Sequence, residues 1–323
     1  MIAKSGPGIM KNLNFLVSLT NNDNDYQIEQ AAAVQETARK LGVGLQIAYG
    51  ENDSITQSQQ ILAAVQSPSD VRPDGIIFEP VGGTAMPQVA RAAAAAGMGW
   101  VVLNRDADYV LELRKAYKTP SFAVTSDHEE IGRIQGRQFA ALLPKGGSVL
   151  YIQGPAESLA AKQRTSGMYE TKPTNVQVKV MRGNWTEASA QKAVASWLRL
   201  STSRQTPVDA IAAQDDSMAL GARKAFQELP ADDPRKRCLS LPFLGCDGLP
   251  KTGQAWIKRG LLTASVFVPP NADKALDMLV RAIQTNAQPP ERNLTVPVSI
   301  PALEELAKQR AEKARVLAAG QAD

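Results

Sequence analysis

Short apolar runs alternate with helical patterns along almost the whole chain. The first apolar run is Asn14–Leu19, and the helical pattern that follows it ends at Gly42. The order then repeats, with apolar runs at Val43–Ala48, Gly75–Phe78 and Trp100–Leu103. Strands separated by helices in this way indicate βαβ units. We therefore predict an α/β fold in which helices cover both faces of a parallel sheet.

The same alternation begins again in the second half of the chain. Strands are predicted at Phe122–Val124, Ser148–Ile152 and Val176–Met181, with helical patterns between them. A last strand is predicted at Leu294–Ile300, followed by a charged helix at Ala302–Ala319. Two repeats of one pattern predict two doubly wound lobes, each with its own parallel sheet.

The length of 323 residues is sufficient for two hydrophobic cores. The last elements of the sequence cross back, so each lobe is built from two segments. We expect an N-terminal lobe of residues 11–124 and 268–292 and a C-terminal lobe of residues 125–267 and 293–323. The pattern predicts a hinge of several strands between them.

The composition argues against two classes of partner. The 36 Lys and Arg residues nearly balance the 32 Asp and Glu residues, and they form no basic stripe for nucleic acid. No apolar run reaches the roughly 20 residues that span a bilayer. The segment Met1–Asn14 lacks the apolar region of a secretory signal, and residues 1–8 are predicted to have no regular structure. This N-terminal sequence fits either a mature exported protein or a cytoplasmic protein.

No cofactor or metal site is predicted. The chain contains neither GxxxxGK[ST] nor GxGxxG, so Gln153–Ser158, at the end of a predicted strand, is not expected to bind a nucleotide. The single histidine, His128, lies at a predicted helix start, where capping explains the local sequence. Cys238 and Cys246 are expected to be reduced, and Cys246 to be buried.

Two predicted strands each end in a carboxylate. One apolar run ends at Gln214, Asp215 and Asp216, and the next ends at Cys246 and Asp247. Ligands of open α/β sheets bind outside the carboxyl ends of the strands. Asp215 and Asp247 are therefore predicted to lie at one rim, with Asp216 or the next residue capping the helix. We favour hydroxyl acceptors over an acid–base pair of the glycosidase kind.

Four further residues follow predicted strands in the first half of the chain. Tyr26 and Asn24 combine an aromatic ring with an amide, which suits a sugar, although turn and cap formation explains most of this run. Asn104 and Arg105 end the fourth strand. Arg105 either pairs with Asp106 at the surface or offers its fork of donors to a ligand.

Two side chains in the second half are candidates for the same rim. Arg164 lies near the start of a predicted helix. Trp185 lies at a strand-to-helix junction, where it either packs in the core or hinge or forms a wall for a ligand. No GxSxG elbow is present, so no catalytic residue is predicted.

Taken together, these segments resemble the type I periplasmic sugar-binding proteins, the ribose-binding-like group, whose fold is shared by the effector domains of LacI-type repressors. The resemblance runs from about Asn14 to Ile300. It is carried by Asn24 and Tyr26, Asp74–Ile77, Asn104 and Arg105, Arg164, Trp185, Ala213–Ala222 and Gly245–Gly248.

The resemblance implies a ligand held between two lobes that close over it by a hinge motion. Compared with ribose binders, Asp215 replaces Asn, Asn104 replaces Asp, and Gln27 replaces a second aromatic residue. Phe267, near the hinge, stands where they have Gln. These departures argue against ribose as the ligand, whereas a ligand of the sugar class is still expected.

The expected function is a periplasmic solute-binding protein that delivers a monosaccharide or polyol to the permease subunits of an ABC importer. The alternative is a cytoplasmic sugar-sensing module of the LacI type, although no helix-turn-helix precedes Asn14. A hydrolase that uses Asp215 and Asp247 is the third possibility.

Overall fold

A computed structural model describes residues 13–82 and 86–319. Residues 1–8, for which no regular structure was expected, lie outside the described part. The chain divides into two compact units. Unit 1 comprises residues 1–125 and 270–294, and unit 2 comprises residues 126–269 and 295–323. The chain therefore passes from one unit to the other three times.

Unit 1 is built on a six-stranded sheet with the order β11-β5-β4-β3-β1-β2. Its strands are β1 (Asn14–Leu19), β2 (Gly44–Tyr49), β3 (Gly75–Phe78), β4 (Gly99–Leu103), β5 (Ser121–Ser126) and β11 (Arg292–Thr295). Strands β1 to β5 pair in parallel. The carboxyl ends of β1, β3 and β4 are consequently neighbours at one edge, in the order β4, β3, β1.

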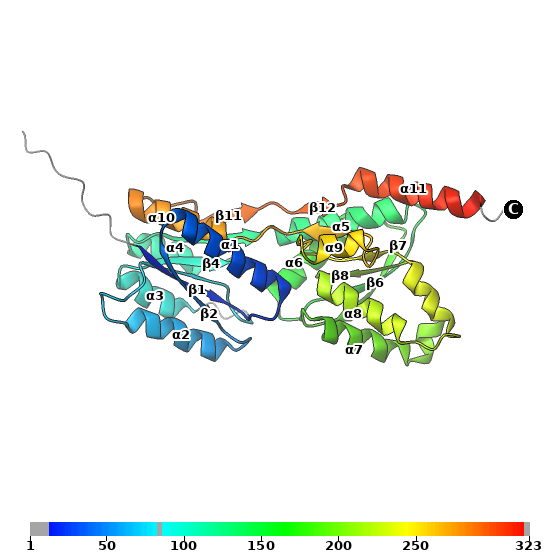
Figure 1. Cartoon of the computed structure of the whole chain (residues 1–323), viewed down its shortest axis with the longest axis horizontal. Helices are drawn as coiled ribbons and strands as arrows, with labels where there is room; N and C mark the ends of the chain where they lie inside the picture. The colour runs from blue at the N-terminus through cyan, green and yellow to red at the C-terminus, as the bar shows by residue number, and fades with distance from the viewer. Residues whose placement is uncertain (1–12, 83–85, 320–323) are drawn as a thin grey trace, which may run out of the picture. The chain divides into compact units, whose positions relative to one another are not determined.

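Alternate residues of these strands face opposite layers of helices. Val17 and Ile77 pack with α1 (Asp25–Leu41) and α10 (Ala272–Thr285). Leu16 and Ile76 pack on the other face with α2 (Ser54–Gln66), α3 (Pro87–Ala95) and α4 (Tyr109–Ala116). Figure 1 shows α1 and α10 on one side of this sheet and α2 and α3 on the other. The predicted doubly wound arrangement is confirmed.

Unit 2 repeats the design with a four-stranded parallel sheet of order β7-β6-β8-β9. Its strands are β6 (Gly147–Gln153), β7 (Val176–Arg182), β8 (Ala210–Ala213) and β9 (Phe243–Leu244). A separate antiparallel pair joins β10 (Ser265–Phe267) to β12 (Val298–Ile300). Parallel bridges from Leu244 to Ala264 and from Asp247 to Phe267 connect the edge of the sheet to β10.

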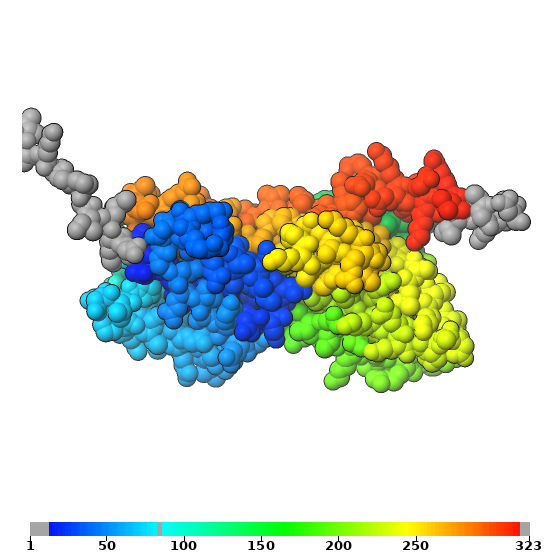
Figure 2. All heavy atoms as spheres, in the orientation of Figure 1, coloured from blue at the N-terminus to red at the C-terminus, as the bar shows by residue number. Residues whose placement is uncertain are grey.

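Helices again cover both faces of the unit 2 sheet. On one face, α7 (Glu187–Leu198) and α8 (Asp216–Gln227) enclose a core that includes Ile152 and Ile211. On the other, α5 (His128–Leu142) and α6 (Leu159–Thr171) lie over Tyr151. The unit also contains α9 (Gly253–Lys258), α11 (Leu303–Ala319) and the short 3₁₀ helices Ser201–Arg204 and Pro234–Ser240. Figure 2 shows α11, drawn red, on the surface of this unit, and among the residues of α11 whose burial is described, Leu306 alone is fully buried.

The structure contains helices that were not predicted, and it divides one predicted strand. Helices α4 and α9 were not predicted, because each is short and carries little periodic signal. The expected strand Leu294–Ile300 is two strands, β11 and β12, in different sheets. Pro297 lies between them, and its missing N–H interrupts a strand. Among the described helices, none is long and apolar enough to cross a bilayer.

Candidate functional site

The loop after β1 positions Asn24 and Tyr26. Asn24 is the N-cap of α1, and its Oδ1 accepts hydrogen bonds from the backbone N–H groups of Tyr26 at 2.9 Å and Gln27 at 3.3 Å. Capping of this kind stabilises a helix by about 1 kcal/mol. Asn24 therefore has a structural role, and Tyr26 follows it with a largely buried ring, 9% exposed.

Asn104 follows β4 in a left-handed conformation, with φ of 56°. Asn tolerates this region better than most residues do. Its Oδ1 accepts a hydrogen bond from Asn271 Nδ2 at 2.6 Å. Asn271 is fully buried, and Gln30 Nε2 donates to its Oδ1 at 2.7 Å. This chain of amides holds the end of β4 in one position.

Arg105 is half-buried and does not pair with Asp106. Asp106 instead accepts from Arg292 Nε at 2.6 Å. The surface-pair alternative for Arg105 is therefore wrong. Burial lowers the pKa of the Arg105 guanidinium, and the charge of Glu79 acts in the opposite direction.

Glu79 was not predicted as a site residue. It follows β3 directly, and its Oε2 accepts a hydrogen bond from Gln27 Nε2 at 2.9 Å. Burial raises the pKa of this carboxyl, whereas hydrogen bonding from Gln27 and Asn104 and the charge of Arg105 act to lower it. A carboxylate directly after a strand was the available signal, but the sequence Glu79-Pro80 resembles an ordinary turn.

Arg164 is the centre of the site residues in unit 2. Its side chain is only 7% exposed, and its Nη1 donates to the carbonyl of Gln214. Its guanidinium carbon lies 5.5 Å from the centroid of the Trp185 ring. Nε of Arg164 is buried and has no hydrogen-bond partner among the described residues. Leaving a buried donor unpaired costs about 1–3 kcal/mol.

Burial alone would lower the pKa of Arg164. The nearby acidic groups Cys246, Asp247 and Asp215 outweigh burial, so the pKa is raised and the guanidinium stays charged. The structure thus brings Arg164, Asp215 and Asp247 into one electrostatic group.

Gln214, immediately before Asp215, organises the backbone around Arg164. It is fully buried, and its Oε1 accepts from Gly154 N at 2.8 Å. Its Nε2 donates to the carbonyl of Ala161 at 3.0 Å and to Thr165 Oγ1 at 2.9 Å. A buried amide with its hydrogen bonds satisfied ties the end of β8 to α6, which carries Arg164.

The cap of α8 is Asp215, not Asp216 or Ser217 as expected. Asp215 accepts from Met218 N at 2.5 Å. Asp216 is a structural residue, because its carboxylate accepts from Gly248 N at 2.7 Å and from Ser265 Oγ at 2.6 Å. The reason is geometric. An N-cap side chain accepts from the backbone N–H three positions later, and Asp215 stands three positions before Met218.

Asp247 and Phe267 lie side by side in a parallel bridge. The backbone N of Asp247 donates to Val266 O, and Val268 N donates to Asp247 O, both at 2.9 Å. Asp247 has φ of 98°, which strains a residue that has a Cβ. Backbone strain of this kind is common at functional sites.

Trp185 packs in the core, which is one of the two roles considered for it, and its role as a wall for a ligand remains a prediction. Its half-buried ring packs against the core between the sheet and α7 and α8. It also lies over Gly154, where an added Cβ would be 2.2 Å from the ring. The ring therefore needs glycine at this position, and the guanidinium of Arg164 also lies near the ring.

The nine predicted residues thus belong to two sets. Unit 1 holds Asn24, Tyr26, Asn104 and Arg105, and unit 2 holds Arg164, Trp185, Asp215, Asp247 and Phe267. In each unit they follow the carboxyl ends of parallel strands or lie beside them. Their role as ligand-binding residues remains a prediction.

Other chemistry finds little support in the described residues. They contain no group of three or more His, Cys, Asp or Glu side chains suited to a metal. Cys238 and Cys246 are buried and free, as expected, and burial raises the pKa of the Cys246 thiol well above its usual value. Asp127 caps α5 just before His128, accepting from Glu130 N at 2.9 Å.

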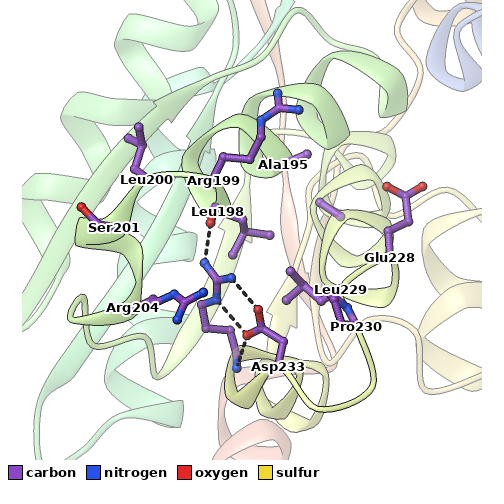
Figure 3. Close-up of a pocket in the computed structure, with 12 residues that line it drawn as sticks. Ala195, Leu198, Arg199, Leu200, Ser201, Arg204, Glu228, Leu229, Pro230 and Asp233 are labelled. Carbon is purple, nitrogen blue, oxygen red and sulfur yellow. Dashed lines mark hydrogen bonds and ion pairs between the residues drawn. The ribbon is translucent and has the colours of Figure 1, made fainter.

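A pocket of about 720 Å³ lies at the opposite end of unit 2. It is lined by the C-terminal ends of α7 and α8 and by the segments that follow them. Figure 3 shows Leu198, Leu229 and Asp233 around this hollow. Asp233 pairs with Arg235 at 2.5 Å, which lowers the pKa of the carboxyl. None of the nine predicted residues lines this pocket.

Replacing Asp247 by Gly is expected to leave the free energy of unfolding unchanged or to raise it by up to about 1 kcal/mol. Relief of strain offsets the entropy that glycine adds to the unfolded chain. Ligand affinity should fall, because a carboxylate acceptor is lost. Urea denaturation and calorimetry measure the two effects. A loss of stability above about 1 kcal/mol would show that the Asp247 side chain mainly supports the fold.

Comparison with known proteins places the chain among binding proteins. The model of the periplasmic binding protein domain matches residues 15–287. A putative rhizopine-binding protein of Rhizobium meliloti is 29% identical over 202 residues. That match covers 60% of this chain and 61% of the relative, less than two thirds of its length. The ribose import binding protein of Bacillus subtilis is 24% identical over 266 residues, covering 82% of this chain and 79% of the relative.

Solved structures show the same fold. The crystal structure of a galactofuranose binding protein superposes with a TM-score of 0.75 at 22% identity, covering 93% of this chain and 98% of that one. A Caulobacter myo-inositol binding protein superposes with a TM-score of 0.72 at 22% identity, and the match covers 93% of this chain and 96% of that one. At these identities the likeness concerns the fold.

Proposed function

The chain belongs to the periplasmic binding protein domain family, and from this we propose that it binds a monosaccharide or polyol for uptake. The observation that carries the proposal is the buried Arg164, with an unpaired Nε, beside the ring of Trp185. Hydroxyl oxygens accept from a guanidinium, and an aromatic ring suits the C–H face of a sugar. Asp215 and Asp247 supply acceptors for hydroxyl protons.

We propose further that units 1 and 2 are the two lobes of the binder and that both residue sets bind one ligand. The expected lobe boundaries lie within two residues of the unit boundaries. Ligand contacts made only in a closed form would favour closure by a hinge. The ligand would then be passed unchanged to the permease subunits of an ABC importer, from the periplasm. Relatives named as ribose and D-allose binders support this assignment.

The proposed function is tested by a thermal-shift screen of the full chain against sugars and polyols. A ligand present at 100 times its Kd should stabilise the protein by about 2.7 kcal/mol. The ligand should be recovered chemically unchanged after long incubation. A screen without any stabilising sugar or polyol would contradict the proposal, and turnover of the ligand would favour the hydrolase.

Closure is tested with the same ligand by small-angle scattering. We expect a smaller radius of gyration at saturation than without ligand, because a ligand shifts the population toward the form that makes more contacts with it. An identical profile would contradict a hinged binder, even where the thermal shift is large.

A further inference from the structure

Gln135 is a fully buried side chain of α5 that reaches the carboxyl ends of β8 and β9. Its Nε2 donates to the carbonyl of Ala213, the last residue of β8, at 2.8 Å. The same nitrogen donates to the carbonyl of Gly245, the first residue after β9, at 3.3 Å. A side-chain amide has two N–H groups, so one group can join the ends of two neighbouring strands.

The backbone ladder between β8 and β9 is short. Its register ends with Ala212 opposite Leu244, and β9 is two residues long. Ala213 and Gly245 each follow by one position, and their carbonyls accept from Gln135. A side chain thus continues the connection between the strands where the ladder stops. The separation of the two strand ends therefore depends on this side chain.

Asp215 and Asp247 are the predicted binding residues that follow these two carbonyls. Each of them lies two positions after one acceptor of Gln135. A displacement of either strand end is passed to a carboxylate over a very short segment of backbone. Both carboxylates act on the pKa of Arg164, so both lie near the same guanidinium.

Tyr151 fixes the orientation of the Gln135 amide. Its hydroxyl donates to Gln135 Oε1 at 2.8 Å and accepts from Gln214 Nε2 at 3.2 Å. Because Oε1 is held by the hydroxyl, the NH₂ group is directed toward the two carbonyls. Tyr151 and Gln214 are fully buried as well, and the Gln214 carbonyl accepts from Arg164. One buried polar network therefore reaches all three charged residues of the predicted set in unit 2.

The backbone of α5 also contacts the helix that carries Arg164. Gly132 lies about one turn before Gln135, and an added Cβ there would be 2.0 Å from the carbonyl oxygen of Arg164. Only glycine permits so close an approach of α5 and α6 at this point. Helix α5 thus supports Arg164 through its backbone and the two strand ends through Gln135.

We propose that Gln135 is a positioning residue that sets the separation of the Asp215 and Asp247 carboxylates. This inference rests on the proposed sugar- or polyol-binding function. Gln135 acts through the two strand ends and not through contact with the ligand. The hydroxyl groups of a sugar have fixed spacings, so acceptors held at one separation bind them with a smaller loss of conformational freedom.

The test uses three variants of the full chain. Gln135→Met keeps the length of the side chain and removes both N–H donors, whereas Tyr151→Phe removes only the hydroxyl that orients the amide. Ser203→Ala is the matched control at the opposite end of unit 2. Ser203 is also buried, and its Oγ bonds two carbonyls, those of Leu198 at 3.2 Å and Leu200 at 2.7 Å.

Binding is measured by titration calorimetry at a temperature at which circular dichroism shows each protein to be folded. The probe is the compound with the largest thermal shift on the wild-type protein among aldopentoses, aldohexoses, pentitols and inositols. We expect Gln135→Met to weaken binding of the probe roughly threefold to a hundredfold, and Tyr151→Phe to weaken it less. Gln135→Met and Ser203→Ala should both lower the melting temperature, but Ser203→Ala should keep the wild-type affinity.

A double-mutant cycle separates positioning from a general effect on the fold. Asp247→Gly removes one of the two carboxylates that Gln135 is proposed to position. In this background, Gln135→Met should weaken binding of the probe by a smaller factor than it does in the wild-type protein. A residue that supports only the fold would give the same factor in both backgrounds.

Each outcome decides the proposal. Unchanged affinity in Gln135→Met overturns it, as does an equal loss of affinity in Ser203→Ala or an equal factor in the Asp247→Gly background. If Gln135→Met does not fold, Tyr151→Phe takes its place in the cycle, and unchanged affinity there overturns the proposal. If no sugar or polyol binds the wild-type protein, the proposed function itself is refuted, and this inference falls with it.

Discussion

Arg164→Lys is expected to weaken ligand binding by about 1.5–3 kcal/mol, roughly tenfold to more than a hundredfold in Kd. The guanidinium of Arg164 lies beside the Trp185 ring and donates to the Gln214 carbonyl while its Nε remains unpaired. A lysine ammonium has no planar fork, so it cannot keep the backbone contact and also donate to the ligand in the same geometry. Titration calorimetry with a ligand identified by thermal shift measures the loss.

Two further variants give this experiment its control and its independent check. Arg133→Lys lies in the same unit, on α5, where the arginine pairs with Glu129 and Glu170 on the outer surface, and it should bind as the parent does. Arg105→Lys should weaken binding from unit 1. Unchanged affinity in both Arg164→Lys and Arg105→Lys would rule out the assignment of these residues to the ligand.

Asp215→Asn is expected to weaken binding of the native ligand by about 1–3 kcal/mol and to relax discrimination against uronic acids. The structure makes this a clean test of charge. Asp215 caps α8 through Met218 N, and Asn is as good an N-cap as Asp, so the helix should remain stable. Removing one negative charge beside Arg164 leaves part of its positive charge for an anionic ligand. A competition assay of a neutral sugar against its uronic acid, on both proteins, measures the change.

The adjacent carboxylate provides the contrast. In Asp216→Asn an NH₂ group replaces one of the two carboxylate oxygens, so either Gly248 N or Ser265 Oγ loses its acceptor. The substitution should therefore lower the free energy of unfolding without a selective effect on uronic acids. If the parent protein already binds the uronic acid more tightly than the neutral sugar, the expected charge preference is wrong.

Local sequence determined the architecture of this protein. Alternating apolar runs and helical patterns predicted β1 and β3 at their observed bounds, and Gly42 ends α1 in the left-handed conformation expected of a helix-terminal glycine. These features depend on periods of two and 3.6 residues and on the conformational range of single residues, which are visible in a short window. The same periodicity predicted that polar residues would follow the strands.

Only the tertiary structure decided which of these polar residues belong together. Gln27 and Glu79 are 52 positions apart, and Gln30 and Asn271 are 241 apart, yet each pair shares a hydrogen bond. The hydrogen bond from Gly248 N to Asp216 and the pairing of Asp106 with Arg292 instead of Arg105 have the same origin. A side-chain hydrogen bond depends on positions within about 3 Å that are set by strand order and helix packing, and no local pattern encodes them. The fold could therefore be predicted from the sequence, whereas the hydrogen-bond partners of these polar residues were set by the packing of distant segments.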